Sequence, residues 1–161
     1  MQQLFAPWRY QYVSNADSTG ECIFCAAARG GAEVMTLART ERAFAILNLF
    51  PYTSGHTMVA PVAHVSDFAH LDGATLAEMM SLAQRVVRAI ERVYRPHGFN
   101  LGFNLGEAAG AGIADHMHMH VVPRWRGDTN FMSTTGDTRV LPEGLADTCA
   151  KLRGALEAGV D

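Results

Sequence analysis

The sequence lacks several features that mark special classes of protein. It holds three cysteines among 161 residues, a number too small and too odd for a disulfide framework. No run approaches the roughly 18 consecutive apolar residues of a membrane span. The start, MQQLFAPWRY, has no basic region followed by an apolar one, so it is not a secretory signal. The net charge of −3 gives no basic excess for nucleic acid. We therefore expect a cytoplasmic protein with no membrane and no nucleic-acid partner.

The composition is instead that of a globular protein. Apolar residues make up 48% of the chain, and the length suits one domain that buries a core without disulfides. We expect a single domain over residues 1–161. Its core should span about residues 20–125, with N-terminal and C-terminal extensions packed on that core.

Hydrophobic periodicity predicts the secondary structure. A capping box at Thr75-x-x-Glu78 and a stripe of apolar residues predict one long helix over residues 72–94, with Met79 and Met80 in the core. Other segments predict strands over residues 33–38, 42–49, 57–62, 99–105 and 115–123, and a C-terminal helix over 141–158. This order favours an α+β fold, a mainly antiparallel sheet with one long helix and a C-terminal helix.

Three histidines alternate along the predicted strand 115–123. A period of two residues puts His116, His118 and His120 on one face and turns the intervening methionines toward the core. Imidazole can act as a neutral nucleophile or a proton carrier near neutral pH. One alternative is a solvated strand face that carries histidines by chance. Another is a soft-metal module for zinc or copper, although the methionine sulfurs would then point away from the imidazoles.

A glycine-rich segment, residues 106–114, precedes this strand. Glycines let the backbone approach a ligand closely and turn N–H groups toward an anion. The segment is not a P-loop, because no Lys-Ser/Thr follows Gly110 or Gly112, and no helix follows it as in a Rossmann fingerprint. A flexible turn is the alternative, but next to three histidines the loop could supply donors for phosphate oxygens.

Two cysteines stand three residues apart, in Cys22-Ile-Phe-Cys25. Such a pair can contribute half of a tetrahedral zinc site, with the other ligands drawn from the triad or from His56, His64, His70 or His97. Two buried thiols are one alternative. A redox pair is another, although the βαβ context typical of such pairs is missing.

Two further side chains allow more than one interpretation. Asn48 ends an apolar strand, where it could cap a turn or bind a hydroxyl group. Trp125 flanks the turn at residues 126–130, where it is either a core residue or a surface on which a base could stack.

The same residues resemble the histidine triad (HIT) family. His116-Met-His-Met-His120-Val-Val is similar to the family motif, and residues 44–61 resemble its segment that ends in Pro-Gly-His and an apolar strand. Three further segments resemble a prokaryotic branch that includes diadenosine tetraphosphate phosphorylase-like proteins: residues 4–9, 22–25 and 120–131. The resemblance covers residues 4–132 and implies a HIT-like α+β fold.

The resemblance implies an enzyme. His118 corresponds to the nucleophile, which attacks the α-phosphorus of a nucleotide and forms a nucleotidyl-histidine that water or phosphate resolves. His120 corresponds to the histidine that contacts the phosphate and the bridging oxygen. His116 corresponds to a supporting histidine, and His56 matches an extra histidine beside the triad. The implied substrates are dinucleoside polyphosphates such as diadenosine tetraphosphate, or other nucleotide conjugates of the phosphoramidate type.

The resemblance also implies nucleotide-binding positions. Asn48 matches the ribose-binding position, Asn104, Gly110 and Gly112 fall in the phosphate-side loop, and Trp125 is the candidate for stacking on a base. Gly112 stands where eukaryotic dinucleoside hydrolases have a glutamine, which leaves phosphorolysis open beside hydrolysis.

Zinc-bearing relatives imply a structural metal held here by Cys22, Cys25, His64 and His116. No carboxylate cluster suggests a catalytic metal, so we expect no obligatory one. Relatives commonly form dimers whose sheets join, so we expect a homodimer or a higher homo-oligomer, and the apolar stripe of the long helix could serve either the core or that interface.

Elementary chemistry adds three expectations about the triad. Neutral imidazole has a pKa of about 6.5, so His118 could attack without a strong base. Its other ring nitrogen must donate to an acceptor, for which a backbone carbonyl is the candidate. Stabilisation of phosphate charge is expected from the loop amides, from His120 as imidazolium, and from Arg124 or Arg126.

Overall fold

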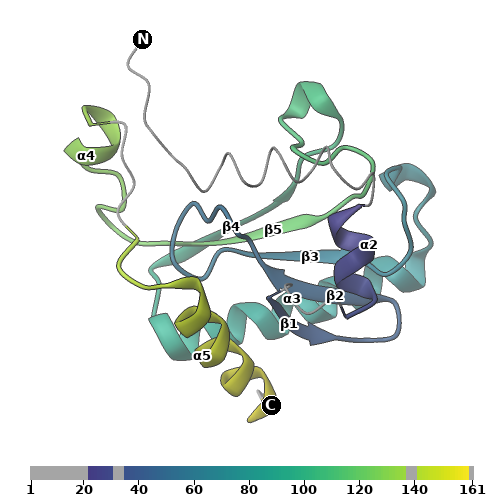
Figure 1. Cartoon of the computed structure of the whole chain (residues 1–161), viewed down its shortest axis with the longest axis horizontal. Helices are drawn as coiled ribbons and strands as arrows, with labels where there is room; N and C mark the ends of the chain where they lie inside the picture. Colours follow the sequence, from purple (N-terminus) through teal and green to yellow (C-terminus); the bar gives the residue numbers. More distant parts are fainter. Residues whose placement is uncertain (1–21, 31–34, 137–140, 160–161) are drawn as a thin grey trace.

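A computed structural model describes residues 22–30, 35–136 and 141–159 (Figure 1). The resemblance at residues 4–9, the expected N-terminal extension and the first part of the strand expected at 33–38 lie outside the described residues. The elements are α2 (Ile23–Ala28), β1 (Thr36–Arg39), β2 (Ala43–Leu47), β3 (Thr57–Pro61), the 3-10 turn η1 (Phe68–His70), α3 (Gly73–Tyr94), β4 (Gly98–Phe103), the 3-10 turn η2 (Glu107–Ala109), β5 (Met119–Arg124), α4 (Phe131–Thr134) and α5 (Leu145–Glu157).

Five strands form one antiparallel sheet in the order β1-β2-β3-β5-β4. The long helix α3 packs on β2, β3 and β5, and α5 packs beside α3 and on β1 (Figure 1). The expected α+β architecture, with one long helix and a C-terminal helix, is confirmed. Within the described residues, no helix combines the length and the apolar character that crossing a bilayer requires.

The sheet separates two apolar clusters because its side chains alternate between the faces. Ala45 and Leu47 of β2 face the cluster that contains α3 and α5. Phe44 and Ile46, their neighbours along the strand, face a second cluster with Phe24 of α2. All five residues of β2 are buried, as a strand covered on both faces requires.

Helix α3 begins differently from the expectation. Asp72 is the N-cap, and its carboxylate accepts hydrogen bonds from the backbone N–H of Thr75 at 2.9 Å and from its hydroxyl at 2.6 Å. The expected capping box is therefore wrong, and Glu78 instead accepts a hydrogen bond from the backbone N–H of Arg42. Met80 was also assigned wrongly to the core: it is 43% exposed, because the buried stripe of α3 runs through Met79 and its neighbours.

The predicted strands overlap the observed ones, with one informative difference. The strand expected at 115–123 begins only at Met119. In the register of β3 and β5, Met117 would pair with Pro61, which has no backbone N–H to donate. The N–H of Met117 donates instead to the carbonyl oxygen of Val65, 2.8 Å away. The first two triad histidines therefore lie in the segment just before the strand. The C-terminal helix is likewise shorter than expected and starts at residue 145, after Gly144.

Candidate functional site

The antiparallel pairing of β3 with β5 brings the triad next to His56. His120 lies opposite Met58, two residues after His56. His56 and His116 are fully buried, His118 is 5% exposed, and His120 is half-buried. The sequence predicted one histidine-lined face, and the structure shows all four imidazoles together.

The proton on His118 is placed by a backbone carbonyl. Nδ1 of His118 lies 2.9 Å from the carbonyl oxygen of His116. A carbonyl oxygen can only accept, so Nδ1 carries the proton and Nε2 keeps its lone pair. The acceptor is of the kind that the sequence led us to expect. Burial lowers the pKa of His118 below the ordinary 6.5, which keeps the ring neutral and nucleophilic.

A second chain of hydrogen bonds orients His120. The backbone N–H of Tyr52 donates to Nδ1 of His56 over 3.1 Å, so the proton of His56 is on Nε2. The Nε2–H of His56 donates in turn to Nδ1 of His120 over 2.9 Å, so the proton of His120 is on Nε2. Nε2 of His120, the ring nitrogen that does not contact His56, therefore carries an N–H.

The expected imidazolium form of His120 is not supported in the free protein. Burial, followed by the nearby His118, lowers the pKa of His120 to about 4. His120 is thus a neutral hydrogen-bond donor at pH 7. Arg124 is also unsuited to stabilise phosphate charge, the role expected of it from the sequence. Its guanidinium donates to Asp128 at 2.6 Å and to Asn100 at 2.7 Å.

Asn48 caps a turn, which is the first of the two roles that its sequence position suggested. Its side-chain oxygen accepts from the N–H of Phe50 at 2.9 Å, which caps the turn after β2. Its amide nitrogen lies 3.4 Å from Nδ1 of His56, so Asn48 also borders the histidines.

An aromatic ring from α2 packs against two of the triad histidines. The ring of Phe24 lies 4.6 Å from that of His118, with 29° between their planes, and 5.1 Å from that of His116. Sequence reasoning missed Phe24, whose only signal is its place between the two cysteines. It also missed Tyr52, which orients His56 through its backbone and whose ring lies 4.5 Å from the His56 ring.

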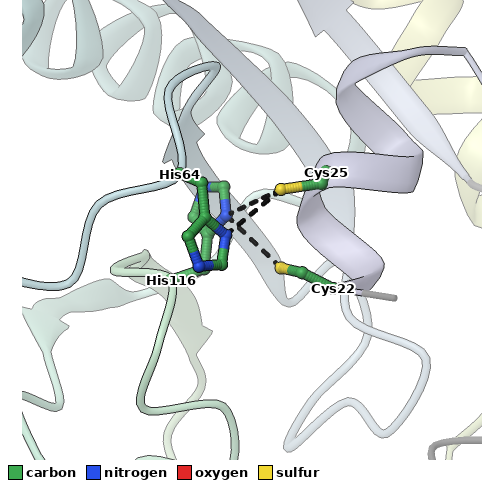
Figure 2. Close-up of side chains that lie close together, drawn as sticks. All are labelled: Cys22, Cys25, His64 and His116. Carbon is green, nitrogen blue, oxygen red and sulfur yellow. Dashed lines mark hydrogen bonds between the residues drawn. The ribbon is translucent and has the colours of Figure 1, made fainter. Parts of the chain in front are cut away.

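Cys22, Cys25, His64 and His116 form a compact cluster, drawn in Figure 2. Their four ligand atoms lie within 4.8 Å of one another. Nδ1 of His116 is 3.4 Å and 3.7 Å from the sulfurs of Cys22 and Cys25, and Nδ1 of His64 is 3.2 Å from the sulfur of Cys25. In a tetrahedral zinc site, ligand bonds of about 2.3 and 2.0 Å separate sulfur and nitrogen by about 3.5 Å. The four residues therefore fit a zinc ion.

The outer contact of His116 supports the same conclusion. Its Nε2 lies 2.9 Å from the carbonyl oxygen of Pro61, so Nε2 carries the proton and Nδ1 keeps the lone pair that faces the two sulfurs. A ligating histidine that donates from its second nitrogen to a backbone carbonyl is the usual arrangement around metals. Burial lowers the pKa of His116, which favours the neutral ring that a metal binds.

The glycine loop is exposed and partly closed on itself. Gly106 and Gly110 have φ of 81° and 84°, conformations that glycine adopts without strain. The N–H of Gly110 donates to the carbonyl of Glu107 at 2.9 Å. This amide is therefore engaged within the loop, whereas Gly112 is exposed at its far end and Asn104 is half-buried just after β4.

A cavity of about 580 Å³ has Tyr52 as its link to the histidine cluster, and no histidine is among its described lining residues. Tyr52, Tyr94 and Trp125 give it aromatic walls, and Asp128 and Glu143 add carboxylates. Tyr52 belongs to both places, because its ring also lies 6.1 Å from that of His120 with 19° between the planes. Trp125 thus lines this cavity, and the stacking of a base on it stays a prediction.

Comparison with known proteins points to one family. Residues 31–127 match the HIT domain. A protein of Mycobacterium tuberculosis (strain ATCC 25618 / H37Rv) that is named AP-4-A phosphorylase is 40% identical over 157 residues, which cover 92% of this chain and 80% of that protein.

Solved structures agree. A zinc-bound histidine triad family protein from Mycobacterium smegmatis is 33% identical, with a TM-score of 0.71, over 86% of this chain and 95% of that chain. A hypothetical histidine triad nucleotide-binding protein from Sulfolobus tokodaii strain7 is 29% identical, with a TM-score of 0.71, over 85% and 93% of the two chains. The resemblance and the fold class drawn from the sequence are confirmed.

Proposed function

Because the chain belongs to the HIT family, we propose that it is an enzyme that transfers nucleotidyl groups through a covalent intermediate on His118. The observation that carries this proposal is which ring nitrogens of His118 and His120 carry a proton. Nε2 of His118 has a free lone pair, and Nε2 of His120 has an N–H. The two rings are 5.0 Å apart between centroids. A nucleophile thus lies beside a donor suited to phosphate oxygens.

In the first step, the lone pair on Nε2 of His118 attacks the α-phosphorus of the nucleotide. A P–N bond forms and the bond from phosphorus to the bridging oxygen breaks, so the remaining phosphate chain leaves with that oxygen. The N–H of His120 donates to oxygen as its negative charge grows. The ring of His118 becomes positive and is stabilised through Nδ1–H by the carbonyl oxygen of His116.

In the second step, an acceptor attacks the same phosphorus and the P–N bond breaks, which restores neutral His118. Water as acceptor gives a nucleoside monophosphate, and inorganic phosphate gives a nucleoside diphosphate. From diadenosine tetraphosphate the first step releases ATP, so the acceptor decides whether AMP or ADP is the other product. Both outcomes belong to the proposal, and the similarity to the M. tuberculosis protein named AP-4-A phosphorylase supports phosphorolysis.

We propose dinucleoside polyphosphates, with diadenosine tetraphosphate as the representative, as the substrates. The aromatic walls of the cavity suit a nucleobase, for which Trp125 is the proposed stacking partner. Asn48, which borders His56, is the proposed ribose contact. Asn104 and Gly112 are proposed to face the phosphates. Gly110, whose N–H is engaged, contributes the turn of the loop instead.

The metal cluster is proposed to hold one structural zinc ion. Four protein ligands close a tetrahedral site, so bound zinc would supply a cross-link rather than a reactive position. Cys22 and Cys25 anchor α2, and His116 anchors the segment whose carbonyl orients His118. A zinc-binding cysteine pair that is not oxidised to a disulfide suits a reducing compartment, and we propose a cytoplasmic location.

Two further proposals concern the assembly. We propose that the described elements belong to a single HIT domain, since α5 packs on α3 and β1. We also propose a homodimer in which a second copy extends the sheet at β4, which lies at one edge. Leu101 on that strand is 45% exposed and, with Met80 and Val87 of α3, lines an apolar groove that a second copy would cover.

The test is the product set from diadenosine tetraphosphate, measured with and without inorganic phosphate. ATP with ADP shows phosphorolysis, and ATP with AMP shows hydrolysis. Cleavage of a nucleoside phosphoramidate alone would move the substrate class to other nucleotide conjugates. Metal binding without any turnover on either substrate would contradict the enzyme and favour a metal-binding module.

A further inference from the structure

Helix α2 presents an aromatic ring to the proposed nucleophile. Phe24 is fully buried, and its ring lies close to parallel with that of His118, at 4.6 Å between centroids and 29° between planes. The near-parallel ring therefore covers one face of the imidazole. Phe24 also stands between Cys22 and Cys25, so the segment that offers two metal ligands also carries this ring.

The contact supplies a restraint that the hydrogen bonds of His118 do not. The bond from Nδ1 to the His116 carbonyl fixes one atom of the ring. Held by its Cβ–Cγ bond and by this one hydrogen bond, the ring can still rotate slightly about Cβ–Cγ, because an N–H···O bond tolerates some bending, and that rotation would swing Nε2 out of line with a phosphorus atom. A flat ring packed on the imidazole face opposes this rotation. Attack at phosphorus needs the lone pair in line with the breaking bond, so the rotation bears directly on the rate.

We propose that Phe24 is a positioning residue that sets the plane of the His118 imidazole for in-line attack. The inference rests on the proposed function, since it takes His118 as the nucleophile. Phe24 touches no reacting atom and acts only through the ring that it covers. It is thus distinct from the rest of its apolar cluster, which packs α2 on the sheet.

Steady-state kinetics of the zinc-loaded protein provide the first test. Phe24→Leu keeps an apolar side chain but removes the flat ring. We expect kcat on diadenosine tetraphosphate to fall by about tenfold or more, with KM changed by less than about threefold and the zinc content unchanged. The matched control is Phe44→Leu: Phe44 is equally buried in the same cluster, and its ring faces Phe24 at 6.4 Å. We expect the control to retain kcat within about threefold.

NMR of the histidine rings provides a readout that does not depend on turnover. In the unmodified protein, ring protons of His118 should show the upfield shift of protons over an aromatic face, and its nitrogens should show a single tautomer with the proton on Nδ1. Phe24→Leu should remove the upfield shift, and Phe44→Leu should keep it. Phe24→Met is a second variant that also removes the flat ring. If neither variant folds, the upfield shift and the single tautomer of His118 in the unmodified protein decide whether Phe24 holds this ring.

Three results would overturn the inference. They are equal kcat in Phe24→Leu and Phe44→Leu, a rise in KM alone, or a mobile His118 ring in the unmodified protein. Failure of the proposed function looks different, because turnover would then survive His118→Ala. Turnover that is lost in His118→Ala but kept in Phe24→Leu defeats the positioning role alone.

Discussion

At the scale of single residues, backbone groups distinguish the two nitrogens of each buried histidine. The carbonyl oxygens of His116 and Pro61 accept hydrogen bonds from Nδ1–H of His118 and Nε2–H of His116. The backbone N–H of Tyr52 donates to Nδ1 of His56, which leaves the proton of that ring on Nε2. Sequence reasoning predicted that a backbone carbonyl would serve His118. It could not predict that His120 stays neutral, because the burial that lowers its pKa comes from segments distant in the chain.

The lowered pKa values predict the pH dependence of the first step. An unperturbed histidine would lose half of its nucleophilic form at pH 6.5. Burial lowers the pKa of His118, so the neutral form persists below that pH and protonation begins to inhibit only in more acidic solution. The acidic limb of kcat/KM for diadenosine tetraphosphate, which has no terminal phosphate titrating near neutrality, should have its midpoint below pH 6.5. A midpoint at or above pH 6.5 would contradict the buried, neutral nucleophile.

Substitution of His118 separates bond making from binding. His118→Ala should abolish turnover and leave nucleotide affinity within about tenfold, because the nucleophile acts mainly in the step that forms the P–N bond. Isothermal titration beside a turnover assay measures both. His70→Ala is the control: His70 is exposed and pairs with Asp67, away from the triad, so it should leave both quantities unchanged. Retained turnover in His118→Ala removes this residue from the mechanism.

At the scale of elements, the alternation of histidine and methionine predicted which face of β5 carries histidine and which face turns toward the core. Met119 joins the core beneath α3, as the period of two requires. The late start of the strand was not predictable from residues 115–118, since it depends on Pro61 of another strand. The short helix α2 was missed because six residues carry too little periodicity to be recognised.

The cysteine-bearing helix supports a prediction about metal content. The protein should hold roughly one zinc ion per chain, and Cys22→Ser should lose it, because the remaining ligands no longer close a tetrahedron. Elemental analysis of dialysed protein measures this. Cys149→Ala is the matched control, since Cys149 lies on α5 and outside the cluster. A native protein without metal, or equal loss in both variants, would contradict the zinc site.

At the scale of the whole molecule, the sheet leaves β4 as an edge. The sequence predicted that strand, but its position at the edge depends on strand order, which periodicity does not encode. Strand order also explains why Met80 is exposed: it points to the groove beside β4 rather than into the core.

The edge strand β4 predicts that the protein forms a dimer. Light scattering after size exclusion should give the mass of two chains, or a multiple of it. Leu101→Lys should shift the protein toward single chains, because a lysine on an edge strand opposes the pairing of sheets. Leu49→Lys is matched in exposure, 44% against 45% for Leu101, but lies outside the edge and should stay dimeric. A monomeric native protein, or dissociation by both variants alike, would contradict the proposed interface.

Intact-protein mass spectrometry after rapid quenching of the enzyme with diadenosine tetraphosphate, in the absence of phosphate, tests the nucleophile most directly. The neutral, buried imidazole of His118 should acquire one adenylyl group, located on that residue by peptide mapping and missing in His118→Ala. An adenylyl group on another residue, or turnover during which no adduct forms at any quench time, would contradict covalent catalysis by His118.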